Sequence, residues 1–146
     1  MREIFSVVAI NIAIFLALIL IHEASHAIAG IYTGCYKVNI VLFDLASLPH
    51  TDLVCPMEGV NWLVHMSGLI TTSLFGLIFL LTRNSKSLVF LAVGFSLIFG
   101  ALDMSILFSS EIPFYISNAV GFGFIISGEC FLASSQLAQK DFSLSI

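Results

Sequence analysis

Long apolar stretches constrain this chain more than any other feature of its sequence. A helix that crosses a lipid bilayer needs about 20 mostly apolar residues. Four stretches meet this requirement, over residues 4–32, 61–81, 87–108 and 113–137. The sequence therefore predicts an all-α integral membrane protein with about four transmembrane helices. We expect it to be a multi-pass protein of the cell membrane.

The composition supports lipid as the surrounding solvent. Apolar residues make up 59% of the chain, charged residues only 10%, and the mean hydropathy is +1.09. A water-soluble domain carries about 25% charged residues. The chain has no basic tract, so nucleic acid is not an expected partner. It also has no internal repeat or low-complexity linker, so residues 1–146 are interpreted as a single domain, and its assembly as a homo-oligomer is left open.

The loop after the first predicted helix is the longest connection in the chain. Residues 36–43 are rich in β-branched and aromatic side chains, which favours a short strand or hairpin lying against the membrane. Residues 48–52 are interpreted as a turn. Cys35 and Cys55 bracket the loop and could form a disulfide if it is extracytoplasmic, whereas Cys130 is predicted to be a packing residue within the last helix.

The distribution of basic residues predicts the orientation of the chain in the membrane. Four of them are expected on one side: Arg2, Arg83, Lys86 and Lys140. Only Lys37 is expected on the other side, which also carries most of the loop acids. Because lysine and arginine favour cytoplasmic loops, both termini are predicted to be cytoplasmic.

The segment His22-Glu23-Ala24-Ser25-His26 is an HExxH motif inside the first predicted helix. Residues four apart share one face of a helix, so both imidazoles can bind one metal ion, and zinc binds neutral imidazole readily. Zinc lowers the pKa of a bound water to about 7. Glu23 is then the candidate catalytic residue, which takes the proton and passes it to the leaving nitrogen of a peptide. The alternative is that His22 and His26 face interfacial water at the helix end.

A catalytic zinc usually has three protein ligands and one open position. Asp103 is the predicted third ligand, because it lies near the end of the third predicted helix. By the helix count, that end is on the same side of the membrane as the end of the first helix, so the depths match. The alternative is a helix-terminal acid exposed to water.

Two further polar residues are candidates for contacts with a substrate. His65 is expected at the level of the metal, as a substrate-binding hydrogen-bond donor, a ligand or an interfacial residue. Asn118 lies at a similar depth in the fourth predicted helix and could bind a substrate backbone. Hydrogen bonding within the helix bundle is the alternative for Asn118.

These residues resemble the motifs of the site-2 proteases, a family of intramembrane zinc metalloproteases. Residues 22–30 look like the family's HExxH segment, and Leu102-Asp103 matches the first two positions of its Leu-Asp-Gly motif, whose aspartate is the third zinc ligand. The resemblance covers roughly residues 10–108. It implies a three-helix core, one zinc ion per chain and Asp103 as a ligand. The small-residue second helix, with Ser67 and Gly68, and the β-prone stretch after the first helix are also similar to family features.

The chain departs from that family at several positions. Met104 replaces the family's glycine, and Ser25 stands where glycine is common. The asparagine and prolines that usually precede Leu-Asp are absent, and so is the Gly-Pro of the second helix. These changes bear on substrate positioning more than on metal binding. In the family the metal tends to lie toward the cytoplasm, whereas the basic residues here place it toward the outside.

The sequence favours an intramembrane zinc endopeptidase that cleaves a membrane-spanning or membrane-adjacent protein or peptide. The β-prone stretch could hold an unwound substrate strand by edge pairing. Two alternatives remain open. One is a proteolytically inactive binding protein that resembles site-2 proteases, and the other is a membrane metal transporter or sensor, because His and Asp in membrane helices also suit ion pathways.

Overall fold

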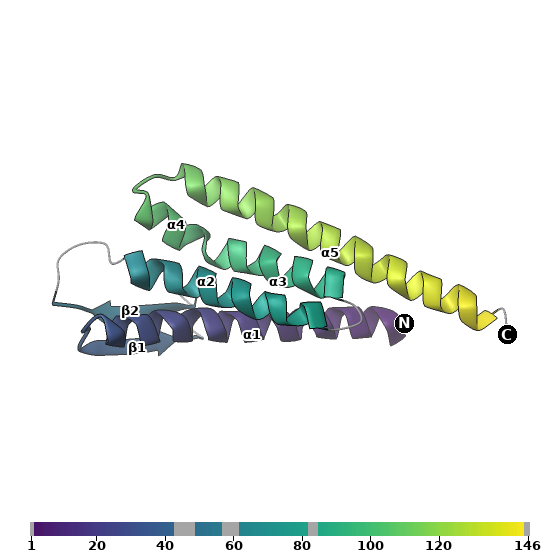
Figure 1. Cartoon of the computed structure of the whole chain (residues 1–146), viewed down its shortest axis with the longest axis horizontal. Coiled ribbons are helices and arrows are strands. Elements are labelled where there is room, and N and C mark those ends of the chain that lie inside the picture. Colours follow the sequence, from purple (N-terminus) through teal and green to yellow (C-terminus); the bar gives the residue numbers. More distant parts are fainter. Residues whose placement is uncertain (1, 43–48, 57–61, 82–84, 145–146) are drawn as a thin grey trace.

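The computed structural model describes residues 2–42, 49–56, 62–81 and 85–144, and Figure 1 shows it as a bundle of long helices with a small hairpin. The helices are α1 (Arg2–Tyr32), α2 (Trp62–Ile78), the 3-10 turn η1 (Phe79–Leu81), α3 (Ser85–Phe99), α4 (Ala101–Leu107) and α5 (Ile112–Leu144). The strands are β1 (Lys37–Val41) and β2 (His50–Val54). The predicted mostly helical fold is confirmed.

The helices are as long and apolar as the sequence predicts. In the described part of the chain, three are long and apolar enough to cross a membrane: Phe5–Tyr32, Trp62–Leu81 and Ile112–Ser135. In the most apolar 18-residue stretch of each of these helices, only 17%, 22% and 22% of the stretch, respectively, is buried inside the protein. Large apolar side chains therefore cover the outside of the bundle, an arrangement that water would disfavour.

The third predicted span is not one straight helix. It consists of α3 and α4, which meet at Gly100 with a bend of 44°. Glycine destabilises a helix interior and is a common site of kinks. A Cβ atom at position 100 would lie only 3.2 Å from Cβ of Leu69 on α2, so the absent side chain also permits close approach there. The bend brings the short helix α4 against α2.

The loop after α1 forms an antiparallel hairpin. β1 lies inside the predicted β-prone stretch, while Phe43 and residues 44–48 lie outside the described residues. The predicted turn over residues 48–52 is wrong for residues 50–52, which belong to β2. In the register, Ile40 pairs with Thr51 and Val41 with His50. Pairing with β1 overrides the local turn preference of this segment.

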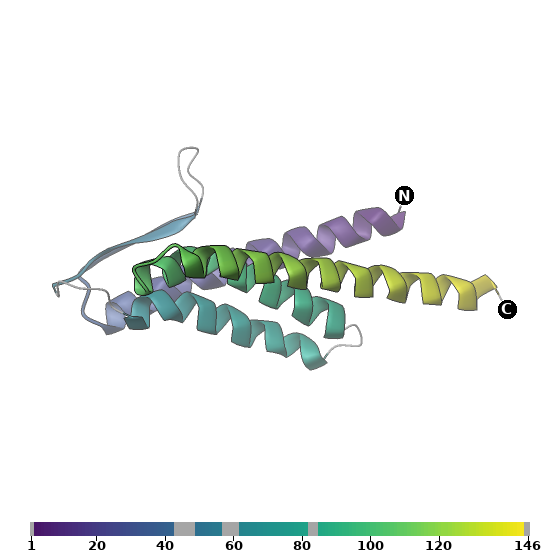
Figure 2. The same cartoon turned by 90° about the horizontal axis from the view of Figure 1, so that it is seen from above.

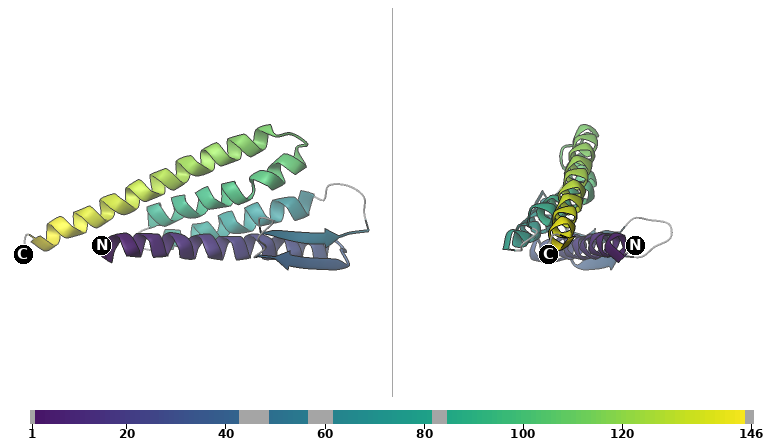
Figure 3. Two further views of the ribbon diagram at one scale, coloured as in Figure 1. Left: turned by 180° about the vertical axis from the view of Figure 1, so that it is seen from behind. Right: turned by 90° about the vertical axis from the view of Figure 1, so that its right-hand side faces the viewer.

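The hairpin packs along the last part of α1, as the view from behind shows (Figure 3). A disulfide joins Cys35, just after α1, to Cys55, just after β2. The backbone N–H of Tyr36 donates to the carbonyl of Val54 at 3.0 Å. The base of the hairpin is thereby fastened to the end of α1. Cys130, predicted to be a packing residue, is instead an exposed free cysteine on α5.

Close helix packing depends on small residues at the contacts. The central apolar cluster joins Ile14 and Leu18 of α1 to Leu91 and Ala92 of α3. A Cβ atom at Gly94 of α3 would lie 2.7 Å from the carbonyl oxygen of Gly121 on α5. Small residues let helix backbones approach in this way where lipid, not water, surrounds a bundle.

The two ends of the bundle differ in what they carry. Figures 1 and 2 place the start of α1 and the end of α5 at one end, and the hairpin and α4 at the other. The start of α3, which includes position 86, lies at the same end of the bundle as the start of α1. Lys37 of β1 lies at the hairpin end. This arrangement agrees with the predicted grouping of Arg2, Lys86 and Lys140 opposite Lys37, while Arg83 lies outside the described residues.

Candidate metal site

Two histidines of α1 form the first half of the site. His22 and His26 lie one helical turn apart, and both side chains are buried. Their ring centroids are 4.6 Å apart and their planes are nearly perpendicular. The helical spacing therefore brings both Nε2 atoms to one point inside the bundle, as the HExxH motif predicts.

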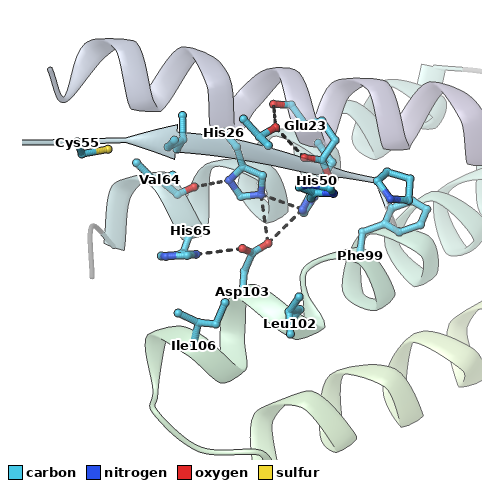
Figure 4. Close-up of a pocket in the computed structure, with 14 residues that line it drawn as sticks. Glu23, His26, His50, Cys55, Val64, His65, Phe99, Leu102, Asp103 and Ile106 are labelled. Atoms are coloured by element: carbon cyan, nitrogen blue, oxygen red, sulfur yellow. Dashed lines mark hydrogen bonds and ion pairs between the residues drawn. The ribbon is translucent and has the colours of Figure 1, made fainter. Parts of the chain in front are cut away.

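Asp103 reaches the same point from the first turn of α4. Its side chain is 15% exposed, and Oδ2 lies 3.1 Å from His22 Nε2 and 3.2 Å from His26 Nε2. The bend at Gly100 turns α4 against α2, next to the histidines of α1, and so places this carboxylate. The structure thus brings the three predicted metal ligands together, and Figure 4 shows Asp103 facing His26.

The three ligand atoms form a nearly equilateral triangle that fits a zinc ion. The two imidazole Nε2 atoms lie 3.0 Å apart, and each is 3.1 or 3.2 Å from Oδ2 of Asp103. A tetrahedral zinc ion with bonds of about 2.0–2.1 Å keeps its ligand atoms about 3.3–3.4 Å apart. The observed separations need only small adjustments to match. Two imidazoles and one carboxylate also leave the open fourth position of a catalytic site.

The hydrogen bond of His26 fixes the tautomer that a metal requires. Its Nδ1 lies 2.7 Å from the carbonyl oxygen of Val64 on α2. Because a carbonyl only accepts, Nδ1–H donates, and Nε2 of the neutral ring carries a lone pair. His22 differs, because its buried Nδ1 has no hydrogen-bond partner in the part of the chain that the structure describes. The two histidines are therefore supported unequally.

Gly68 of α2 provides the space that the two imidazoles occupy. A Cβ atom at this position would lie 2.6 Å from Cε1 of His22 and 2.7 Å from Nε2 of His26. Any side chain there would displace both rings. Gly68 is one of the small residues of the second predicted helix, and the structure shows that it leaves room for the two imidazoles.

Glu23 is held by a residue that sequence reasoning missed. The Glu23 side chain is buried, and its Oε2 accepts a hydrogen bond of 2.7 Å from the hydroxyl of Thr51 on β2. The same hydroxyl lies 3.0 Å from the backbone carbonyl oxygen of Glu23. Thr51 fell within the predicted turn, so no local signal pointed to it. Only the pairing of β2 with β1 places it beside the motif.

His65 also lies at the site, but it is not one of the three clustered ligands. Its Nδ1 lies 3.1 Å from Oδ1 of Asp103, the carboxylate oxygen that faces away from His22 and His26. Figure 4 shows Asp103 between His26 and His65. His65 thus lies beside the candidate ligands, and its predicted role in substrate binding stays a prediction.

A cleft of about 530 Å³ opens over these residues. One wall comes from β2 and includes His50 and Thr51, and another comes from α3 and α4 through Phe99 and Leu102. Glu23 lines the same cleft as the three metal-ligand candidates. The cleft is thus large enough for a segment of peptide beside the clustered polar groups.

Asn118 is not brought into this cleft. Its amide donates to the carbonyl of Phe114, one turn earlier in α5, at 2.9 Å. The cleft lining among the described residues comes from α1, α2, α3, α4 and the segment around β2, not from α5. A substrate contact by Asn118 stays a prediction.

Comparison of the chain with protein-family models, curated proteins and solved structures finds no match in any of the three. The function is therefore argued from the geometry of the site.

Proposed function

We propose that this protein is an intramembrane zinc endopeptidase with the architecture of a site-2 protease. The observation that carries the proposal is the triangle of ligand atoms from His22, His26 and Asp103, with Glu23 in the same cleft. The HExxH and Leu-Asp motifs resemble that family and supply the same set of groups. Two buried histidines and a partly buried aspartate among apolar helices also need a joint explanation, because ionisable groups are costly there.

Each residue has a separate task in peptide hydrolysis. A zinc ion held by the triangle would polarise a water molecule and the scissile carbonyl. Glu23 takes one proton from the attacking water while the water oxygen bonds to the carbonyl carbon. When the carbon–nitrogen bond breaks, Glu23 returns that proton to the leaving nitrogen. The products are one carboxylate and one amine, so a single water molecule is consumed.

We place the cleft at the extracytoplasmic surface of the membrane. Helices α1 and α3 begin at Arg2 and Ser85, at the opposite end of the bundle, so Arg2 and Lys86 lie there. Lysine and arginine favour the cytoplasmic side of a membrane. The disulfide between Cys35 and Cys55 lies at the cleft end, and disulfides persist in oxidising compartments. Two unrelated signals thus support one orientation, which is opposite to the tendency of site-2 proteases.

The substrate is a membrane-spanning or membrane-adjacent peptide segment near that surface. A helical peptide hides its carbonyls in internal hydrogen bonds, so it must unwind before water can attack. The β2 strand forms one wall of the cleft and could pair with the extended segment that results. The need for unwinding and the strand beside the cleft favour substrates whose helix unwinds easily at the extracytoplasmic surface of the membrane.

The experiment is a comparison of Glu23→Gln with the wild-type protein in liposomes that contain a mixture of single-span membrane proteins. New peptide ends are identified by mass spectrometry. We expect wild-type protein to generate cleavage products, and Glu23→Gln to reduce them by at least about 100-fold while retaining zinc, since general acid–base catalysis contributes that much.

Glu111→Gln is the matched control, because Glu111 is an exposed acid before α5, outside the cleft lining. This variant should cleave like the wild type. Equal cleavage by Glu23→Gln and wild type would contradict the proposed mechanism. Zinc flux across the liposome membrane that tolerates Glu23→Gln would instead support a transporter.

A further inference from the structure

His65 contacts the candidate metal site through a hydrogen bond to the Asp103 carboxylate. Its Nδ1 lies 3.1 Å from Oδ1 of Asp103, and a carboxylate oxygen can only accept, so the ring donates. The His65 side chain is 25% exposed, whereas that of His22 is 5% exposed. His65 therefore stands at the edge of the cleft, outside the triangle of ligand atoms.

The two oxygens of Asp103 have separate partners. Oδ2 faces His22 and His26, while Oδ1 faces His65. The Asp103 carboxylate can rotate about the bonds of its side chain. Such a rotation would exchange the positions of Oδ1 and Oδ2 or direct both oxygens at the metal. The hydrogen bond from His65 opposes that rotation and keeps Oδ2 directed at the imidazoles.

We propose that His65 is a positioning residue that sets zinc affinity by holding Asp103 in a one-oxygen binding mode. This inference rests on the metal site of the proposed function but not on proteolysis. The physical basis is general, because outer hydrogen-bond partners of metal ligands orient them, and their loss weakens metal binding by about 10- to 100-fold. Neither the HExxH motif nor the Leu-Asp motif includes this residue.

Three substitutions at position 65 separate this role from simple packing. The side-chain amide nitrogen of asparagine can occupy the place of Nδ1, whereas that of glutamine reaches the place of Nε2. Leucine removes the donor and keeps much of the volume. We would purify His65→Asn, His65→Gln and His65→Leu without metal and compare their melting temperatures. Zinc affinity is then measured by competition with a chromophoric chelator.

We expect zinc binding by His65→Leu and His65→Gln to weaken by about 10- to 100-fold, and His65→Asn to stay within about threefold of the wild type. Thr71→Val, an exposed position on the same helix, is the control and should bind zinc normally. Should His65→Leu fail to fold, the comparison of asparagine with glutamine still decides the matter.

Unchanged affinity in His65→Leu would overturn the inference, and so would equally weak binding by the asparagine and glutamine variants. Wild-type protein without zinc affinity would overturn both this inference and the metal site. The expected affinities in a wild-type protein that cleaves nothing would uphold the role of His65 and contradict the protease proposal alone.

Discussion

The hydroxyl of Thr51 donates a 2.7 Å hydrogen bond to Oε2 of Glu23, and so joins the β-hairpin to the centre of the HExxH motif. Glu23 is buried, and the strand that carries Thr51 also forms a wall of the cleft. The hairpin is therefore part of the site.

Thr51→Val should impair catalysis while leaving zinc in place. Valine keeps the shape of threonine but removes the hydroxyl, so the Glu23 carboxylate loses the donor that orients it. A hydrogen bond to a charged group contributes about 1.5–3 kcal/mol, which corresponds to a loss of about tenfold or more in kcat. Steady-state kinetics on an identified substrate would check this, with KM expected to change little.

The matched control is Thr51→Ser, which restores a hydroxyl at nearly the same place and should recover most of kcat. If the serine variant were as impaired as the valine variant, a hydroxyl at this position would not be sufficient for activity, and the hydrogen bond alone would not explain the loss. A normal kcat in Thr51→Val would show that Glu23 needs no such support.

Gly68→Ala should remove zinc binding. The added Cβ would lie within 2.7 Å of both metal-ligand histidines, so the rings or the α2 backbone must move. We expect bound zinc to fall to less than about a tenth of the wild-type level, since ligand geometry determines zinc affinity. Gly123→Ala is the control, because a Cβ atom there meets nothing within 4 Å. Retention of full zinc by Gly68→Ala would mean that the imidazoles of His22 and His26 do not pack against Gly68 of α2 as described.

Loss of the disulfide should loosen the hairpin. Cys35 and Cys55 are 20 residues apart, and a cross-link of this span stabilises a folded chain by about 3 kcal/mol. The double variant Cys35→Ser/Cys55→Ser should therefore cleave substrate as poorly as Thr51→Val while still binding zinc. Wild-type cleavage rates in the double variant would indicate that β2 is held by its pairing alone.

The orientation of the chain can be read from the same cysteines. Cells are quenched with acid, and the denatured protein is alkylated with a mass tag before or after reduction. We expect one tag, on Cys130, without reduction and three tags after reduction, because the cleft end should meet an oxidising compartment. Three tags without reduction would contradict the proposed orientation.

The helices and the clustering of His22 with His26 could be predicted from sequence because both depend on local rules. Apolar length marks the helices, and the four-residue spacing of His22 and His26 needs only helical geometry. Asp103 could be predicted from helix counting, because the ends of successive spans alternate between the two sides of a membrane. That argument gives depth, and the structure adds the direct contact of Asp103 with both histidines.

The features that sequence reasoning missed depend on long-range packing. The bend at Gly100 follows from how α4 meets α2, since a single glycine does not always break a helix. Residues 50–52 resemble a turn by composition and become a strand only by pairing with β1. Thr51 then meets Glu23 across 28 positions of sequence, a contact for which no local pattern exists.

The metal site is tested most directly by the amount of zinc bound per chain in purified wild-type protein and in Asp103→Ala, measured by elemental analysis in detergent. We expect about one zinc ion in the wild type and a loss of most of it in the variant, because a catalytic zinc site needs three protein ligands. Absence of metal from well-folded wild-type protein, or full zinc in Asp103→Ala, would contradict the site of His22, His26 and Asp103.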